Sequence, residues 1–225
     1  MKYDELKKNA PHLFSNHNAA IKIITDQSII NNWEKIRKNE LRENGYPEQW
    51  GDTGLVFEDP YFVIIRDLVE FPNGKIWFYS RLINQADIKG VQGVVVMPEF
   101  EGKIMLLNNF RHATRSWHYE FPRGFGEPNK TAKYQAQEEI KEETGSNIKS
   151  LIDLGSYHNN TGMEGNEVQL FYAKLASIGK PDKASGIESF HWVTTTELEK
   201  LIRDDTITDG FTIAAYTKAK LQGII

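Results

Sequence analysis

Four glutamates stand within six residues of one segment: Glu138, Glu139, Glu142 and Glu143. On a helix, side chains three or four residues apart share a face, so Glu139, Glu142 and Glu143 would project together and repel by roughly 0.2–0.5 kcal/mol per pair. A cation among the carboxylates removes this cost, and clustered carboxylate oxygens suit Mg2+, Mn2+ or Ca2+. Such an ion commonly reaches its site with substrate phosphates. The segment therefore predicts a site for a divalent cation and a phosphate.

The residues around the glutamates indicate a short helix behind a tight turn. Thr131 is a typical N-cap residue and Gly145 a typical residue just after a helix end. The preceding stretch Glu120-Phe-Pro-Arg-Gly-Phe-Gly126 carries two glycines, which let a backbone approach a ligand closely. An acidic run can also be an ordinary solvated helix face. The flanking turn and caps favour the cation site.

The composition excludes several classes of function. The chain has 225 residues and a net charge of −4, which argues against sequence-independent binding of nucleic acid. It has no cysteine, which excludes disulfides, thiol catalysis and cysteine zinc sites and fits a reducing cytoplasm. The first residues show no signal peptide, and no apolar run approaches the ~20 residues that span a bilayer. We therefore expect a cytoplasmic location, with no nucleic-acid or membrane partner.

The chain must also supply the elements that position these glutamates. Residues 1–50 show helical periodicity, and from Leu55 onward the sequence alternates as strands do. A Pro72-Asn-Gly turn predicts a hairpin of strands 61–69 and 75–82. Further strands are expected at 93–98, 103–108, 117–121, 151–157, 168–175 and 190–193, and helices at 194–203 and 208–221. Strands mixed with a few helices predict an α/β sandwich on a mixed β-sheet.

The acidic segment resembles the Nudix box, which reads glycine, five residues, glutamate, seven residues, then Arg-Glu-apolar-x-Glu-Glu-x-Gly-apolar. The matching positions are Gly124, Glu139, Ile140, Glu142, Glu143 and Gly145. Three positions depart from the pattern, with Lys130 in place of the first glutamate, Glu138 in place of the arginine and Ser146 in place of the last apolar residue. A basic residue thus replaces an acidic one at position 130, and an acidic residue replaces a basic one at position 138. One hypothesis is therefore that the family's acid–base pair is kept as Lys130–Glu138, with the two charges exchanged.

Segments outside the box resemble the ADP-ribose pyrophosphatase branch of this family: 93–98, 103–112, 119–124 and 207–215. The resemblance covers about residues 55–222. It implies a Nudix-type α/β/α sandwich with a mixed β-sheet, plus an N-terminal helical extension. The expected domains are an extension at 1–50 and a Nudix domain at 51–225, which comprises a β-hairpin region at 51–90 and a core at 91–225.

The resemblance also implies an activity, the hydrolysis of a nucleoside diphosphate linked to another group, with Mg2+ or alternatively Mn2+ as cofactor. The nearest implied reaction converts ADP-ribose to AMP and ribose 5-phosphate. Hydrolysis of another nucleotide sugar or of a dinucleotide stays open, as does a non-catalytic nucleotide-sensing role. The branch often pairs through an N-terminal extension, which implies a homodimer formed by the N-terminal helix and the hairpin at 61–82.

By the same resemblance, Glu139 and Glu143 are direct metal ligands, Glu142 binds a second ion or binds through water, and the backbone carbonyl of Arg123 completes the sphere. This branch often takes its general base from a loop beyond the box, here 161–167, where Glu167 fits best and Glu164 is a close second, with a polar hairpin tip as the alternative. The two catalytic glutamates of the box are Glu142 and Glu143.

Four further residues are expected beside the substrate. Arg111 is the candidate diphosphate contact, since guanidinium binds phosphate bidentately, and a surface salt bridge is its alternative. Trp117 either stacks on the base or packs in the core. Glu120 and Gly124 flank the turn. Asp209 is expected to cap a helix.

Overall fold

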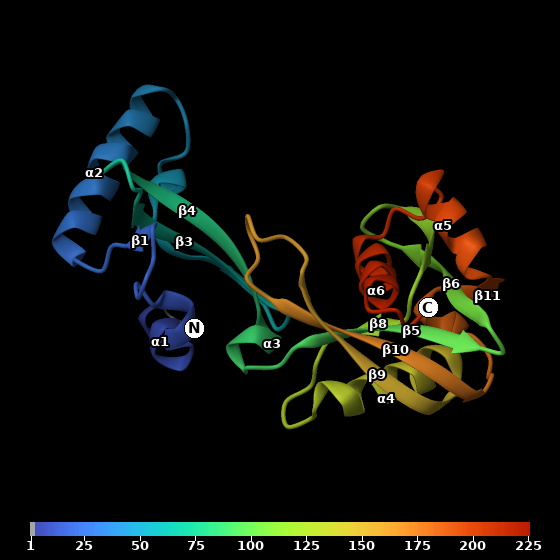
Figure 1. Cartoon of the computed structure of the whole chain (residues 1–225). Coiled ribbons are helices and arrows are strands. Elements are labelled where there is room, and N and C mark those ends of the chain that lie inside the picture. Colours follow the sequence, from blue (N-terminus) through green and yellow to red (C-terminus); the bar gives the residue numbers. More distant parts are fainter. Residues whose placement is uncertain (1–2) are drawn as a thin grey trace. The chain divides into compact units, whose positions relative to one another are not determined.

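The computed structural model describes residues 3–225 and divides into two compact units. The first unit contains the described residues up to Gly90 together with Asn160–Gly165, and the second contains Val91–Asn159 and Asn166–Ile225. Figure 1 colours the first unit mainly blue to green and the second green to red. The domain boundary expected at residue 50 stays a prediction. Within residues 3–225, no helix is both long and apolar enough to cross a membrane.

The first unit is a small antiparallel sheet with helices. Strand β3 lies in the middle, pairs with β4 on one side, and pairs with β1 and β2 on the other. The α-helices and strands are α1 (Tyr3–Asn9), β1 (Lys22–Ile23), α2 (Gln27–Glu43), β2 (Gly54–Glu58), β3 (Phe62–Glu70), β4 (Ile76–Asn84) and α3 (Gln85–Ile88), with 3-10 helices at Pro11–Phe14 and Glu48–Gly51.

Local chemistry explains the elements of this unit. The Asp26 carboxylate accepts the Ser28 and Ile29 N–H groups and begins α2. The predicted hairpin turn is confirmed between β3 and β4, where Gly74 has φ +78°. A positive φ costs glycine no Cβ clash. The interior is apolar and includes Leu6, Ala10, Val63, Ile65 and Ile83.

The segment Asn160–Gly165 pairs with the edge of β4. The Leu82 N–H donates to the Met163 carbonyl at 3.0 Å, and the Tyr79 hydroxyl donates to the Gly162 carbonyl at 2.6 Å. A parallel bridge joins Leu82 to Glu164. One backbone group of β4, the Leu82 N–H, therefore finds its partner in this segment, and the Tyr79 side chain adds a second contact.

The second unit is built on a seven-stranded mixed sheet. The order is β11-β6-β5-β10-β9, with β7 paired to β6 and β8 paired to β5. Strands β5 and β10 run parallel, and the other pairs are antiparallel, which confirms the expected mixed sheet. The strands are β5 (Gly93–Phe100), β6 (Lys103–Arg111), β7 (Ser116–Glu120), β8 (Arg123–Gly124), β9 (Asn147–His158), β10 (Glu167–Ser177) and β11 (Ile187–Val193).

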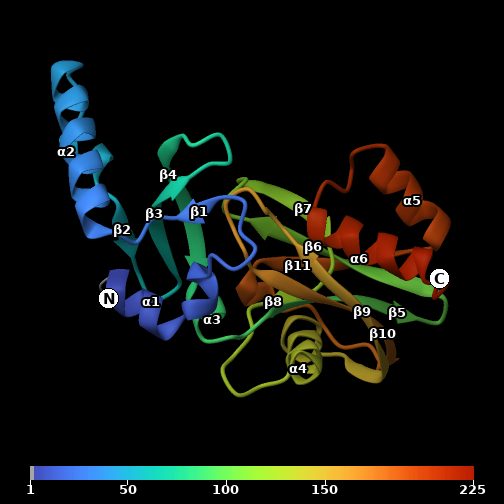
Figure 2. The ribbon, with the colours of Figure 1, turned by 60° about the vertical axis from the view of Figure 1, so that its left-hand side comes forward.

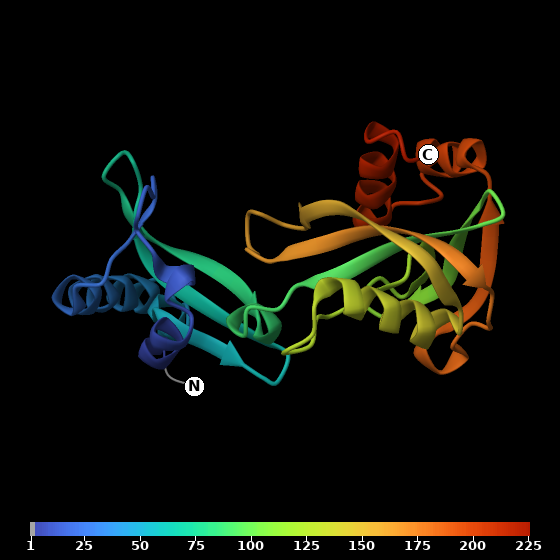
Figure 3. The same cartoon turned by 60° about the horizontal axis from the view of Figure 1, so that its bottom comes forward.

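Helices cover both faces of this sheet: α4 (Ala132–Thr144) on one, α5 (Thr195–Arg203) and α6 (Gly210–Leu221) on the other (Figures 2 and 3). A 3-10 helix at Lys183–Ser185 precedes β11. Successive side chains of a strand point to opposite faces. Val94 and Val96 therefore pack with Ile140 of α4, whereas Val95 and Met97 join the core of α5 and α6. The expected α/β/α sandwich is confirmed.

Candidate active site

Helix α4 begins and ends where its sequence predicts. The Thr131 hydroxyl accepts the Tyr134 N–H at 3.2 Å, and Gly145 adopts φ +62° while its N–H donates to the Lys141 carbonyl. The buried side of α4 is partly polar, because it includes Gln135 and Glu139 beside Ala136 and Ile140. The helix thus carries a carboxylate into the interior of the second unit.

Glu139 lies against the backbone of Gly124. A Cβ atom on Gly124 would stand 1.8 Å from Glu139 Oε1 and 2.3 Å from Oε2, so a larger residue there must displace the Glu139 carboxylate. Glu139 is 9% exposed, and Gln135 Nε2 donates to its Oε1 at 3.0 Å. Burial raises the pKa of Glu139, the Gln135 hydrogen bond opposes this, and the negative charge of Glu142 adds to it.

Glu143 lies one turn further along the same helix. Its Oε2 accepts the backbone N–H of Arg123 at 3.1 Å. Burial, with the neighbouring charge of Glu139, raises the pKa of Glu143 to about 8. The charge of Arg111 acts in the opposite direction but does not outweigh burial. The buried Glu139 carboxylate and the half-buried Glu143 carboxylate therefore repel each other beside the Arg123–Gly124 backbone.

This donor set fits a hard divalent cation. Among residues 3–225, no three His, Asp or Glu side chains are gathered closely enough to form a metal site by themselves. Two crowded carboxylates and a neighbouring backbone strand nevertheless offer the oxygen ligands that Mg2+ takes, the remainder usually being water and substrate phosphate. Glu142 is exposed on the same helix. The roles of Glu139, Glu142, Glu143 and the Arg123 carbonyl as ligands stay predictions.

Replacing Gly124 with alanine should lower the affinity for Mn2+ at least about tenfold, because the new methyl group must push the Glu139 carboxylate out of place. Electron paramagnetic resonance of free Mn2+ measures this affinity. Gly74→Ala is the matched control, since its Cβ meets no atom within 4 Å but its positive φ costs about 1 kcal/mol. Equal Mn2+ affinities in the two variants would contradict the prediction.

A third carboxylate, that of Glu120, is buried and accepts several donors. It is 0% exposed and accepts Asn109 Nδ2 at 2.8 Å and Arg111 Nε at 3.0 Å, while Arg111 Nη2 pairs with its other oxygen. Arg123 Nη2 is 3.4 Å from Glu120 Oε2. Arg111 therefore forms a salt bridge, as the alternative expected, although its carboxylate partner is buried and not at the surface. The diphosphate contact of Arg111 stays a prediction.

Substituting Arg111 by methionine should lower the free energy of unfolding by about 3 kcal/mol, since it removes the closest cation from the buried Glu120 carboxylate and leaves only Asn109 and the more distant Arg123. Urea denaturation measures the change. Lys183→Met removes one partner of the exposed Lys183–Glu188 pair and should cost only about 0–1 kcal/mol. Similar costs for the two variants would mean that the Arg111–Glu120 pair contributes no more than a surface pair.

Trp117 lies on β7 and packs edge to face on Phe110, with ring centroids 5.4 Å apart. Its side chain is 52% exposed, so the core-packing alternative is wrong. An exposed aromatic face suits stacking with a planar ligand. Base stacking by Trp117 stays a prediction.

The two candidate bases fall in different units. Glu167 begins β10 in the second unit, where its Oε2 accepts Gln92 Nε2 at 3.0 Å and its Oε1 lies 3.8 Å from His158 Nε2. Gln92 directly precedes Gly93, which lies against the Gly124 carbonyl. Glu164 belongs to the first unit, where it is bridged to Leu82. Glu167 therefore belongs to the same unit as Glu139, and its role as the base stays a prediction.

The proposed Lys130–Glu138 pair is wrong. Lys130 Nζ forms its ion pair with Glu127 Oε2 at 2.8 Å, within the turn that precedes α4. No ion pair joins Lys130 to Glu138 in the part of the chain that the structure describes. The physical reason is local, because Glu127 is three residues away in the same turn. The side chain that orients Glu139 is instead Gln135, one helical turn before it.

Sequence reasoning missed Gln135 and Asn109 and assigned Asp209 only a capping role. Gln135 stands four residues before Glu139, so helical spacing could have revealed it. Asn109 lies on β6 and Asp209 at the start of α6, far in sequence from the acidic helix. Their contacts with Glu120 and Arg123 depend on the tertiary fold, so no local sequence pattern predicts them. Asp209 Oδ1 is 3.2 Å from Arg123 Nη1.

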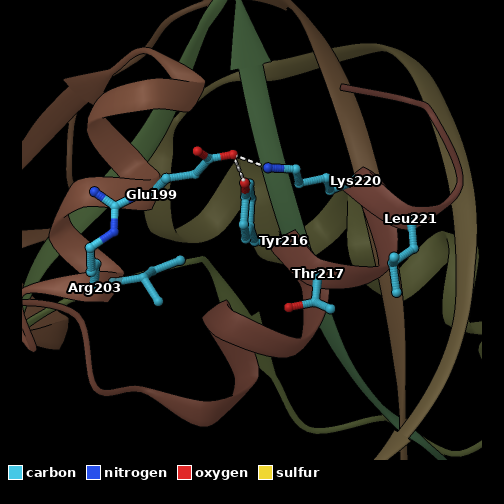
Figure 4. Close-up of a pocket in the computed structure, with 7 residues that line it drawn as sticks. Glu199, Arg203, Tyr216, Thr217, Lys220 and Leu221 are labelled. Atoms are coloured by element: carbon cyan, nitrogen blue, oxygen red, sulfur yellow. Dashed lines mark hydrogen bonds and ion pairs between the residues drawn. The ribbon is translucent and has the colours of Figure 1, made fainter.

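A separate hollow lies between α5 and α6 and does not include these carboxylates (Figure 4). Its volume is about 370 Å³. The Tyr216 hydroxyl and the Lys220 ammonium both bind Glu199 Oε1 there. Because the acidic partner is already bound by two donors, the hollow offers no free carboxylate for a cation.

Comparison with known proteins gives a consistent set of relatives. A family model described as NUDIX domain matches residues 89–212. The ADP-ribose pyrophosphatase of Bacillus subtilis (strain 168) is 27% identical over 159 residues, which are 68% of this chain and 82% of that protein. The methanol dehydrogenase activator of Bacillus methanolicus is 26% identical over 184 residues, which are 79% of this chain and 95% of that protein.

A solved structure, that of an ADP compounds hydrolase, has a similar fold with a TM-score of 0.64. The similarity covers 77% of this chain and 95% of that chain at 19% sequence identity. At this identity the comparison supports the architecture described above and carries nothing about substrate.

Proposed function

Because this chain is a hydrolase of the Nudix family, whose domain model spans residues 89–212, we propose that it cleaves the pyrophosphate bond of a nucleoside diphosphate linked to a second group. The proposed substrate is ADP-ribose, and the products are AMP and ribose 5-phosphate. The similarity to a protein named ADP-ribose pyrophosphatase supports this choice.

The observation that carries the proposal is the pair Glu139 and Glu143 beside the Arg123–Gly124 backbone. These two carboxylates and the Arg123 carbonyl would hold Mg2+, for which Mn2+ can substitute, and Glu142 would bind a second ion directly or through water. When bound, the cation supplies charge neutralisation on the diphosphate and a lowered pKa of the attacking water. Pairing with a cation would also relieve the repulsion that raises the pKa of Glu143.

The other residues would bind and orient the substrate. Arg111 uses Nε and Nη2 for Glu120, and its remaining N–H groups are available to a phosphate oxygen. Trp117 would stack on the adenine with its exposed face. Glu167 would accept the proton of the attacking water as general base. Gly124 would let the backbone approach the diphosphate.

A panel of nucleotides with and without Mg2+ tests the proposal. ADP-ribose, a UDP-sugar and a dinucleoside polyphosphate are incubated with the protein, and the products are separated by chromatography. Equal amounts of AMP and ribose 5-phosphate, formed from ADP-ribose only when Mg2+ is present, are expected. Hydrolysis of another nucleotide of the panel, without hydrolysis of ADP-ribose, would contradict the proposed substrate but support the proposed type of reaction. Binding of ADP-ribose without turnover of any member would overturn the catalytic role.

We also propose that the protein is a homodimer that forms through the first unit. Exposed apolar side chains there include Ile29, Ile36, Val56 and Phe57, on α2 and β2. Analytical ultracentrifugation of the full chain measures the mass, and a monomer at micromolar concentration would contradict this proposal. A cytoplasmic location stays a prediction.

A further inference from the structure

The N-terminus of α6 contacts the segment that enters the candidate metal site. Thr212 Oγ1 accepts the backbone N–H of Phe121 at 2.9 Å. The Arg123 guanidinium stacks on the Phe211 ring, 4.4 Å from its centroid, and its Nη1 is 3.2 Å from Asp209 Oδ1. The segment Phe121–Arg123 is therefore held at both ends by three residues from the start of one helix.

The two carboxylate oxygens of Asp209 have different partners. Oδ2 accepts the Thr212 N–H at 2.9 Å and the Thr212 hydroxyl at 2.8 Å, which is an N-cap arrangement. Oδ1 faces Arg123. The Asp209 side chain is only 10% exposed, so water screens this ion pair weakly. The helix cap uses only the Oδ2 atom of Asp209, and the Oδ1 atom forms the ion pair with Arg123.

Arg123 connects this helix end to the glutamates. Its backbone N–H donates to Glu143 Oε2, and the next residue, Gly124, lies against the Glu139 carboxylate. Its side chain lies between two carboxylates, Glu120 and Asp209. Arg123 therefore contacts the start of α6 through its guanidinium, and the Arg123–Gly124 backbone contacts both candidate metal ligands.

We propose that Asp209 is a positioning residue for the metal site, which acts through Arg123 and not only as the cap of α6. The proposal rests on the proposed function for its catalytic consequence, although its effect on metal binding does not depend on which nucleotide is cleaved. Residues that orient metal ligands typically change metal affinity or activity 10- to 100-fold when they are replaced.

Asp209→Asn separates the two roles. Asparagine is as good an N-cap as aspartate, so α6 keeps its start, whereas the charge opposite Arg123 is lost. The matched control is Asp26→Asn, which makes the same change at the N-cap of α2, where the described contacts are to Ser28 and Ile29. Each variant is measured for its unfolding midpoint, its Mn2+ dissociation constant, and kcat and KM for ADP-ribose.

The expected result for Asp209→Asn is a Mn2+ dissociation constant raised about tenfold or more, with a lower kcat and a KM within twofold of the parent. Its unfolding midpoint should shift no more than that of Asp26→Asn, which should keep the parent's Mn2+ affinity. Unchanged Mn2+ affinity in Asp209→Asn, whatever its stability, would overturn the proposal and leave Asp209 as a cap.

Arg123→Met is a second test if Asp209→Asn folds poorly, because it removes the same ion pair, together with the contacts to Glu120 and Phe211, and leaves the cap of α6 intact. It should weaken Mn2+ binding to a similar degree, and adding Asp209→Asn to it should cause little further loss. Additive losses would overturn the proposal. If the parent binds Mn2+ but hydrolyses no nucleotide, the proposed function fails while the Mn2+ measurements still decide the role of Asp209.

Discussion

Glu143→Gln is expected to lower kcat/KM for Mg2+-dependent hydrolysis by about a thousandfold or more. The substitution removes a charged ligand from a site whose cation is worth several kcal/mol to the transition state, and about 4 kcal/mol corresponds to a thousandfold in rate. Glutamine keeps the size of the side chain and can still accept the Arg123 N–H. Steady-state kinetics with ADP-ribose at saturating Mg2+ measure the loss.

The same substitution should stabilise the metal-free protein at high pH. The pKa of Glu143 is about 8 in the folded chain, above its ordinary value of 4.5, so the unfolded chain releases the proton first. The stability of the metal-free parent therefore falls as pH rises from about 4.5 to about 8. Because glutamine does not ionise, the variant should unfold at a higher temperature than the parent at pH 9 and lose this advantage near pH 4.5.

Glu142→Gln is the control for this stability effect, since Glu142 is exposed on the same helix. Its unfolding midpoint in the absence of metal should stay close to that of the parent at both pH values. If Glu143→Gln retained more than a tenth of the parental kcat/KM, Glu143 would not be a ligand, whatever its effect on stability.

Glu167→Gln is expected to lower kcat by about 10²–10⁴-fold, the usual effect of removing a general base. The KM should change little, because a general base acts on the attacking water in the transition state. A pH profile is the diagnostic measurement, since the loss of a base should remove the acidic limb of kcat. The Mn2+ dissociation constant should change less than in Glu143→Gln.

Glu164→Gln is the matched comparison, from the same loop but the other unit. Its carboxylate neighbours Asp87 in the first unit, and its backbone bridges to Leu82. It should keep kcat within about threefold of the parent, far below the 10² that a lost base costs. A large loss for Glu164→Gln and none for Glu167→Gln would reverse the assignment of the base.

The parts of the fold that were predictable are those that local chemistry determines. Thr131 caps the start of α4 and Gly145 caps its end, and both could be predicted because capping depends on a few neighbouring residues. The β3–β4 hairpin follows from its turn sequence, and the alternating strands of the second unit follow from burial on two faces. The pairing of Asn160–Gly165 with β4 was not predictable, since backbone hydrogen bonds between distant segments leave no side-chain pattern.

The candidate site likewise has features that the local sequence predicts and features that depend on tertiary packing. Glu139 and Glu143 could be placed together from helical spacing alone. The approach of Glu139 to Gly124, and the ion pairs of Glu120 with Arg111 and Arg123, depend on how the strands pack. Charge reversal at Lys130 suggested the wrong partner, because complementary charges at a distance cannot compete with a carboxylate in the same turn.

The chain passes from one unit to the other at residues 90–91, 159–160 and 165–166. Expression of residues 1–90 alone would omit the segment that binds the edge of β4, and an uncovered strand edge promotes aggregation. Expression of residues 91–225 alone would leave six residues of that fragment without their partner strand. Because the first unit consists of two separate stretches of the sequence, neither truncation yields a complete unit. Functional assays should therefore use the full-length chain.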